Sequence, residues 1–394
     1  MINLHEPFIT GNEWKYVKNC LNKGWVSSSG SYVNLFEKKI AKYTGSKYAI
    51  ACVNGTSALQ LSLKLVGTHS GDEVIVPSMT FIAPVNAISY NNAMPIFMDN
   101  NDNYTIDINK TLEFIEKKTK TIKKKKKIIT INRKTGKRIV ALIVVHLFGN
   151  VVEIDKLLRI CKKKNISLIE DAAESVGSFY YSGKYRNRHT GTVGKIGCLS
   201  FNGNKIITAG GGGMILTNDL KIAKRAKYLT TQAKDDNINY IHNDIGYNFR
   251  LSNLQAALGI AQLESLPSYI RRKRKIHKIY KKKINKIAGL RVSETSNSSK
   301  CNYWLNIVEF KKKISKNIFL KIIKYLQKNG IQARPIWYPN HLQRKYKNCQ
   351  TYRLDNIQKI YQNRLCIPSS SQLTKNQQNF VCDKIKNVYE KFIN

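Results

Sequence analysis

Apolar and polar positions between residues 31 and 235 alternate between the spacing of helices and that of strands. Apolar residues at helical spacing predict helices at 31–43, 58–66 and 83–90. Short apolar runs between them predict strands at 48–53, 73–76 and 94–98. Strands that alternate with helices form a mostly parallel sheet covered by helices on both faces, so we predict an α/β fold.

Two later runs extend this pattern, and a third segment interrupts it. Residues 138–147 (RIVALIVVHL) are apolar without a break, as expected of a strand buried on both faces. Residues 168–170 form a shorter strand candidate, which ends at the acidic pair Glu170-Asp171. Residues 118–137 are strongly basic, and a run of like charges of this kind predicts a solvated surface insertion.

The pattern changes after residue 250. Helical segments are predicted over 251–286, a strand in NYWLNIVEF and a further helix in NIFLKIIKYLQKNG. We therefore predict a large domain at 1–250 and a smaller α+β C-terminal domain at 251–394.

The composition is that of an ordinary globular protein, with 42% hydrophobic residues in a chain of 394. No apolar run reaches the roughly 18 residues that a membrane-spanning helix needs, and the first residues lack the pattern of a signal peptide. The eight cysteines have neither CxxC spacing nor a Cys/His pattern typical of metal sites. We therefore expect a cytoplasmic protein with reduced cysteines, no metal site and no membrane partner.

A net charge of +42 is the one unusual bulk property. Such a charge attracts nucleic acid and anionic membranes. The basic residues are spread along the whole chain, however, and no nucleic-acid-binding motif is present. Lys, Ile and Asn are abundant together, which favours an AT-rich coding sequence as the cause, so we expect no nucleic-acid partner.

The segment NGTSAL stands between a predicted strand and a predicted helix. Gly55 permits a tight turn there, and Thr56 and Ser57 place hydroxyl groups beside the free N–H groups of the first helical turn. This arrangement suits a phosphate group. An ordinary helix cap explains the same residues equally well.

Asp171 stands at the carboxyl end of a buried strand, which is where open α/β sheets bind ligands. A carboxylate buried there needs a partner, because an isolated buried charge is costly. A protonated pyridine nitrogen is one such partner; a helix cap or a structural ion pair is the alternative.

Lys205 lies in SFNGNKIITAGGGG, between an apolar strand and a run of glycines that allows close approach of backbone to a ligand. An amine in such a restricted setting can act as a nucleophile. The candidate phosphate site at NGTSAL, the acid Asp171 and the lysine Lys205 follow one another in this chain, and Lys205 stands 205 − 171 = 34 residues after Asp171. Fold-type I pyridoxal phosphate (PLP) enzymes use the same chain order.

With these motifs in place, the sequence resembles the DegT/DnrJ/StrS family of nucleotide-sugar aminotransferases. The resemblance runs over nearly the whole chain, through the blocks GWVSSSGSYVNLFEKKIAKYTG, NGTSALQLSL, GDEVIVPSMTFIAPVNAI, EDAAESVGS, SFNGNK, GYNFRLSNLQAALG and RPIWYPNH. It implies a fold-type I PLP aminotransferase with a mostly parallel central sheet.

The resemblance also implies a role for each matching residue. Lys205 forms a Schiff base with PLP and then shuttles the substrate proton, and Asp171 holds the pyridinium nitrogen. Glu174 lies near the ring hydroxyl of the cofactor, and Phe81 stacks on the ring face. The implied phosphate contacts are Thr56, Ser57 and Ser200 and, from a neighbouring subunit, Asn248, so that the resemblance implies a homodimer. Arg334, Tyr338 and His341 match a block near the sugar-nucleotide pocket, or else a packing segment of the small domain.

One branch of the family removes a hydroxyl group from its substrate, and it carries histidine in place of this lysine. Lysine at position 205 therefore implies transamination. We expect L-glutamate as the amino donor and a nucleotide-linked 4-keto-6-deoxy sugar as the acceptor. The first choice is a UDP-linked 4-keto-6-deoxy-N-acetylhexosamine, and the alternative is GDP-4-keto-6-deoxymannose, as in perosamine synthesis. A non-catalytic regulator with the same fold is a further alternative. A nicotinamide-dependent sugar epimerase is excluded, because no GxGxxG turn follows a predicted strand.

Overall fold

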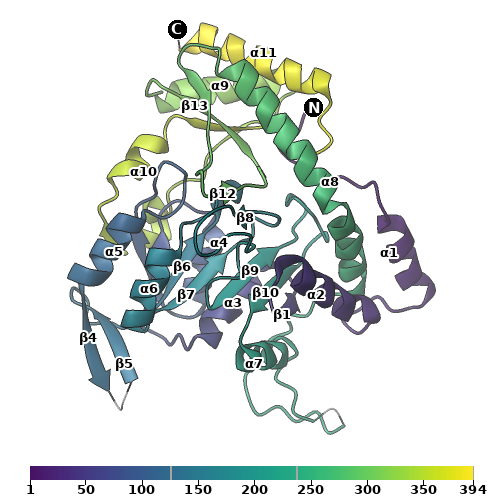
Figure 1. The fold of residues 1–394 in the computed structure, drawn as a ribbon, viewed down its shortest axis with the longest axis vertical. Coiled ribbons are helices and arrows are strands. Elements are labelled where there is room, and N and C mark those ends of the chain that lie inside the picture. The colour runs from purple at the N-terminus through teal and green to yellow at the C-terminus, as the bar shows by residue number, and fades with distance from the viewer. Residues whose placement is uncertain (125–126, 237, 394) are drawn as a thin grey trace.

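The computed structural model describes residues 1–124, 127–236 and 238–393 and is built around one eight-stranded sheet (Figure 1). The strands lie in the order β1 (Tyr48–Cys52), β10 (Gly213–Thr217), β9 (Ile196–Ser200), β7 (Ser167–Asp171), β6 (Ile139–Val145), β2 (Glu73–Pro77), β3 (Met94–Met98) and β15 (Thr351–Tyr352). Strand β10 is antiparallel to both of its neighbours, and all other neighbouring pairs are parallel. The predicted mostly parallel α/β sheet is confirmed.

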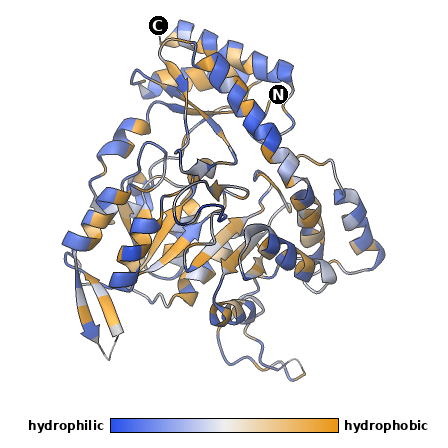
Figure 2. Cartoon of the chain, viewed as in Figure 1, coloured by the Kyte–Doolittle hydropathy of each residue, from blue (hydrophilic) through white to orange (hydrophobic). Residues whose placement is uncertain are grey.

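Helices cover both faces of this sheet and create two separate apolar cores. The helices of this part are α1 (Glu13–Asn22), α2 (Ser31–Thr44), α3 (Gly55–Leu65), α4 (Ile82–Tyr90), α5 (Ile108–Lys117), α6 (Asp155–Lys164) and α7 (Leu220–Thr230). All seven residues of β6 are buried; Ile143 and Val145 face one core, and Leu142 and Val144 face the other. The continuous apolar run therefore predicted a doubly buried strand correctly, and Figure 2 shows these strands as the most hydrophobic part of the fold.

The basic insertion forms a β-hairpin at the edge of the fold (Figure 1), made of β4 (Thr119–Lys124) and β5 (Lys127–Asn132). Lys120 and Lys123 are exposed, in agreement with the predicted solvated surface. Residues 125 and 126 of this insertion lie outside the described residues.

A second sheet of four strands follows the large one, in the order β11 (Leu290–Val292), β13 (Asn306–Phe310), β16 (Arg364–Ile367) and β14 (Arg334–Pro335). Helices α9 (Lys316–Lys328) and α11 (Lys375–Phe392) pack with this sheet around a third apolar core. The smaller elements are β8 (Phe179–Tyr180), β12 (Ser299–Lys300) and α10 (Asp355–Ile360). One boundary was predicted wrongly: NYWLNIVEF becomes a strand only from Asn306, because Tyr303 adopts a positive φ of 51° that interrupts the extended backbone.

The helix α8 (Asn253–Ile284) runs from the large sheet to the small one (Figure 1). Ala256 and Ile260 in its first half join the core of the large sheet, whereas Ile276 and Tyr280 join that of the small sheet. Strand β15 also returns to the large sheet, so a division of the chain at residue 250 remains a proposal. No helix within the described ranges is long and apolar enough to cross a membrane.

Candidate active site

A cavity of about 280 Å³ opens where the parallel strands end. Loops that follow β1, β2, β7 and β9 meet there, as expected for ligand sites of open α/β sheets. Six of the predicted residues line it: Thr56, Phe81, Asp171, Glu174, Ser200 and Lys205. A larger and more open groove of about 660 Å³ lies beside α5, α6 and β8 and contains none of the predicted residues.

Lys205 stands on one wall of the cavity, in a turn in which its backbone N–H donates to the Asn202 carbonyl at 2.9 Å. Its side chain is 11% exposed, and Nζ lies 3.8 Å from Glu174 Oε1. Nζ also lies 4.3 Å from the centre of the Trp304 ring, which is a cation–π contact. Lysine in this chain is common at the surface, but this amine is held between a carboxylate and an aromatic face.

Asp171 is the last residue of β7 and is 5% exposed. Its Oδ1 accepts a hydrogen bond from the Ala173 backbone N–H at 3.0 Å. Burial raises the pKa of this carboxyl, although the Ala173 N–H and the positive charge of Lys205 act in the opposite direction. Because burial makes its negative charge costly, the Asp171 carboxylate favours a cationic ligand in the cavity. A protonated pyridine nitrogen is such a cation.

Glu174 is also buried, and burial raises the pKa of its carboxyl in spite of nearby Lys205. Its Oε2 accepts a hydrogen bond from the Phe148 backbone N–H at 2.8 Å, while Oε1 faces Lys205. Asn302 holds the same turn by donating to the Glu174 carbonyl at 3.0 Å. The side chain is therefore fixed in place beside the lysine.

The first turn of α3 forms one end of the cavity. Asn54 caps this helix by accepting the Ser57 backbone N–H at 2.8 Å, and helix geometry leaves the remaining N–H groups of the turn without intrahelical acceptors. A Cβ at Gly55 would lie 2.8 Å from Ser200 Cβ, so only glycine lets these two segments approach so closely. Thr56 and Ser200 line this end, whereas Ser57 is buried and outside the lining. The end is a cradle suited to a phosphate group.

Phe81 keeps 53% of its surface exposed although it borders the cavity, and its ring packs edge-on against Trp337. The hydroxyl of Thr80 and the indole nitrogen of Trp337 are buried without a hydrogen-bond partner among the described residues. An open aromatic face together with unsatisfied donors at the cavity fits a flat, polar ligand. The residues present therefore fit PLP.

Besides Ser57, four predicted residues lie outside the cavity of this chain. Asn248 is exposed on the segment between α7 and α8, where its backbone bridges to Thr231. Arg334 and Tyr338 are exposed, and the Tyr338 ring packs on Tyr361. His341 Nδ1 lies 2.6 Å from Ser78 Oγ behind the cavity, where burial lowers the pKa of the imidazole.

Several residues that line the cavity were not predicted, chiefly Asn54, Trp304 and Trp337. Asn54 could have been found, because asparagine is a preferred helix cap and precedes Gly55 directly. Trp337 lies within the predicted RPIWYPNH block, but periodicity does not tell which of its side chains turns inward. Trp304 comes from a segment 99 residues after Lys205 (304 − 205 = 99), so only tertiary structure brings the two together.

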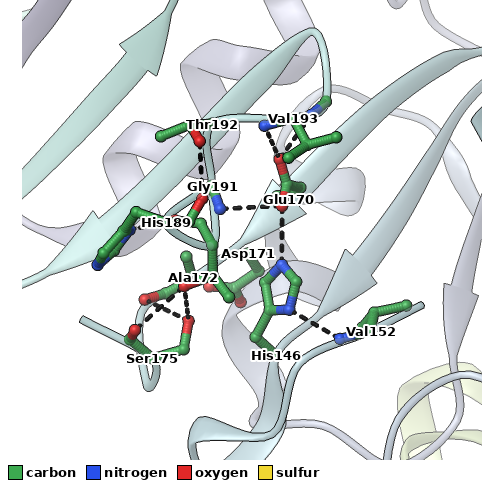
Figure 3. Close-up of polar contacts among 12 residues, drawn as sticks. His146, Val152, Glu170, Asp171, Ala172, Ser175, His189, Gly191, Thr192 and Val193 are labelled. Carbon is green, nitrogen blue, oxygen red and sulfur yellow. Dashed lines mark hydrogen bonds and ion pairs between the residues drawn. The ribbon is translucent and has the colours of Figure 1, made fainter. Parts of the chain in front are cut away.

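A buried network fixes the strand end that carries Asp171 (Figure 3). Glu170 accepts hydrogen bonds from His146 Nε2 at 2.9 Å and from the backbone N–H groups of Gly191, Val193 and Gly194 at 2.9, 2.8 and 2.6 Å. Burial alone would raise the pKa of Glu170, but these donors hold it below its usual value. His146 Nδ1 accepts the Val152 N–H at 3.1 Å, so Nε2 is the protonated nitrogen that donates to the carboxylate.

This network acts on the cofactor side through the backbone. Glu170 and Asp171 are consecutive in β7, so their side chains point to opposite faces of the sheet. The His146 N–H donates to the Asp171 carbonyl at 3.0 Å, and the loop 189–194 wraps around Glu170 (Figure 3). Asp171 is thus held by a rigid backbone rather than by contacts of its own side chain alone.

Comparison with known proteins gives a consistent result. The sequence model of the DegT/DnrJ/EryC1/StrS aminotransferase family matches residues 7–386. The GDP-perosamine synthase of Escherichia coli O157:H7 is 35% identical over 390 residues, which covers 98% of both chains. The GDP-perosamine synthase of Caulobacter vibrioides is 35% identical over 377 residues, 95% of this chain and 94% of the relative.

The solved structures agree with the sequence comparison. A DegT DnrJ EryC1 StrS aminotransferase from Brucella abortus superposes with a TM-score of 0.85 at 25% identity, with 96% of both chains covered. Enzymes of this family depend on PLP. The chain therefore belongs to the DegT/DnrJ/EryC1/StrS family, and it is a PLP-dependent aminotransferase of nucleotide sugars.

Proposed function

We propose that this enzyme transfers the amino group of L-glutamate to a GDP-linked 4-keto-6-deoxy sugar, as in the formation of GDP-perosamine. The observation that carries the catalytic part is the single cavity that holds Lys205, Asp171 and the phosphate cradle at Thr56 and Ser200. Support for the sugar comes from the two relatives named GDP-perosamine synthase, each 35% identical over nearly the full chain.

The residues of the cavity divide the chemistry between them. Bound PLP supplies a ring that withdraws electrons from the carbon carrying the amino group. The Asp171 carboxylate would hold the protonated ring nitrogen, a contact that would offset the cost of burying the carboxylate. Lys205 Nζ would hold the cofactor, and its free amine would accept or donate the proton at the carbon that carries the amino group.

The remaining residues position the cofactor and exclude water. Thr56 and Ser200 bind its phosphate at the first turn of α3, and Phe81 covers one face of its ring. Glu174, fixed by the Phe148 N–H, keeps Nζ of Lys205 near the reacting atoms when that amine is free. The contacts combine orientation with electrostatic stabilisation, as catalysis by a preorganised site requires.

The sugar nucleotide is the part of the proposal that most needs a direct test. Purified enzyme should be incubated with L-glutamate and either GDP-4-keto-6-deoxymannose or a UDP-linked 4-keto-6-deoxy-N-acetylhexosamine, and each product identified by mass. We expect kcat/KM for the GDP-linked sugar to be at least about tenfold higher, a difference of about 1.4 kcal/mol in transition-state binding. Turnover of the UDP-linked sugar alone would favour our first sequence-based choice instead.

We further propose that the enzyme is a homodimer in which Asn248 of one subunit completes the phosphate site of the other. Asn248 lies on the surface and outside the cavity of its own chain. The same segment exposes large apolar side chains, namely Ile238, Tyr240, Ile241 and Ile245. An exposed apolar surface of this kind is typical of an interface between proteins.

Hybrid dimers test this arrangement. We expect Asn248→Ala and Lys205→Ala each to be nearly inactive alone, because every site then lacks one essential group. When the two proteins are mixed and allowed to exchange subunits, a hybrid contains one intact site, so activity should recover to about a quarter of wild type. If a mixture that contains hybrids, as shown by mass spectrometry, regains no activity, then Asn248 does not complete the site of the partner subunit.

A further inference from the structure

A lysine without an acidic partner is buried directly behind the active site. Lys273 lies in the middle of α8 and is 0% exposed. Its Nζ donates to the Trp304 carbonyl at 3.0 Å and to the Ser369 carbonyl at 2.6 Å. No carboxylate of the described residues forms an ion pair with it, and burial lowers the pKa of the ammonium to about 7.

One of the two acceptors of Lys273 belongs to the cavity lining, and the other holds the N-terminal segment. Trp304 lines the cavity and carries the ring on which Lys205 Nζ rests. Ser369 donates its backbone N–H to the Leu4 carbonyl at 2.8 Å and thereby holds the N-terminal segment. Lys273 itself is absent from the cavity lining, so it acts on the site only through these neighbours.

The Trp304 residue is held from three sides. Its indole N–H donates to the Asn204 carbonyl at 2.7 Å, and its backbone N–H donates to Asn302 Oδ1 at 2.9 Å. The third anchor is the hydrogen bond that the Trp304 carbonyl accepts from Lys273 Nζ. The first two anchors come from Asn204, which lines the cavity, and from Asn302, which is tied to Glu174, and Lys273 is the anchor from α8.

We propose that Lys273 is a positioning residue for the reaction: by binding the Trp304 and Ser369 carbonyls, it keeps the Trp304 ring against the amine of Lys205. The inference rests on the proposed role of Lys205 as the cofactor-binding amine. An apolar side chain at position 273 would avoid the cost of a buried amine but would leave two buried carbonyl groups unsatisfied. Trp304 could then shift, and a small displacement at a reacting group is enough to slow catalysis strongly.

The neighbouring ring of His5 adds no second positive charge to this buried region. His5 packs beside Trp304, with ring centroids 6.5 Å apart, and both of its ring nitrogens are buried without a partner in the described part of the chain. Burial, with Lys273 and Lys205 nearby, lowers the pKa of His5 well below its usual value, so the ring is neutral. The Trp304 and Ser369 carbonyls are therefore the groups that stabilise Nζ of Lys273.

The test uses Lys273→Met, with the exposed Lys275→Met on the same helix as a matched control. The first measurement is made on cofactor-free protein at pH 9: the rate at which Lys205 is acylated is followed by peptide mass spectrometry. The Trp304 ring lies over the Lys205 amine and stabilises its positive charge, so displacement of the ring should raise this acylation rate about threefold or more. At this pH the Lys273 amine, whose pKa burial lowers to about 7, is largely neutral, so Lys273→Met removes little charge near Lys205.

A double-mutant cycle then asks whether Lys273 acts through Trp304. In a Trp304→Leu background, Lys273→Met should leave the acylation rate of Lys205 unchanged, because the ring that it positions is gone. In the enzyme loaded with PLP, Lys273→Met should lower kcat by about tenfold or more, with KM for the sugar changed by less than about threefold. Should Lys273→Met fail to fold, Lys273→Gln is used instead: its shorter side chain keeps an amide NH2 donor, so we expect the same changes with smaller magnitudes.

An unchanged rate of Lys205 acylation, a slower one, or an equal increase in the Trp304→Leu background would overturn the inference. The acylation measurement needs neither cofactor nor sugar. It therefore remains decisive even if the sugar substrate is not the one proposed above.

Discussion

Replacement of Lys205 by alanine is expected to lower kcat by at least about a thousandfold, a loss of about 4 kcal/mol in transition-state stabilisation. The variant loses both the covalent attachment of PLP and the amine that moves the substrate proton. The structure leaves no substitute, because Lys205 is the one lysine among the cavity-lining residues of the described chain. The rate is best measured in single turnovers with L-glutamate, before any sugar is added.

The appropriate control is a lysine of similar chemistry without a place in the cavity. Lys227, which pairs with Glu37 on the surface at 2.8 Å, can be changed to alanine at a cost of less than about 1 kcal/mol in stability and with no effect on kcat. Borohydride reduction followed by peptide mapping should fix the cofactor to Lys205 in the wild-type enzyme only. Substantial amino transfer by Lys205→Ala would refute the assignment.

Replacement of Asp171 by asparagine should give the second large effect, a decrease in kcat of about a hundredfold to a thousandfold. Asparagine retains the oxygen that accepts the Ala173 N–H, so the local backbone is preserved. The negative charge that holds a protonated ring nitrogen is lost, and a partner charge buried in such a site is worth about 3–4 kcal/mol. Single-turnover rates and the affinity for PLP, measured side by side, check this result.

The same substitution should not destabilise the cofactor-free protein. Burial raises the pKa of Asp171 in the folded state, so its contribution to stability is largest below the unfolded pKa and is lost as the pH rises through the folded pKa. At neutral pH the buried carboxylate therefore opposes folding, and asparagine removes that cost. Cofactor-free Asp171→Asn should melt at the wild-type temperature or above it. A lower melting temperature would indicate a structural role for the carboxylate.

Local patterns in the sequence predicted most of the elements, and the resemblance to the family added the cavity residues Phe81, Glu174 and Ser200. The run at 138–147 became β6, and Gly45 ends α2 because it adopts a φ of 75° that other residues avoid. Asp171 was predicted from its place at a strand end, since parallel strands bring their carboxyl ends to one edge of the sheet, and Lys205 from its setting between an apolar strand and a run of glycines. The spacing of apolar residues and the residue preferences of turns involve only a few neighbouring residues, so they can be recognised in a single sequence.

Contacts between distant segments were not predictable in this way. Trp304 reaches Lys205 only because Tyr303 interrupts the extended backbone before β13 and Asn302 ties the turn to Glu174. Lys273 appears in the sequence as one basic residue in a strongly basic helix, yet it is buried against two carbonyl groups. Neither contact can be recognised from the neighbouring residues in the sequence, because each depends on packing between elements far apart in the chain.

The sequence by itself thus determined the alternating α/β order, the tight turn at Gly55 for which we propose phosphate binding, and the places of Asp171 and Lys205 that we propose as acid and amine of the site. These features follow from short-range rules: the period of apolar residues, the conformations open to glycine, and the position of polar residues at strand ends. The tertiary structure alone decided which aromatic rings enclose Lys205 and which buried groups hold Asp171 and Trp304 in place. The physical reason is that each buried polar group needs a hydrogen-bond partner, and in a closely packed fold that partner can come from any part of the chain.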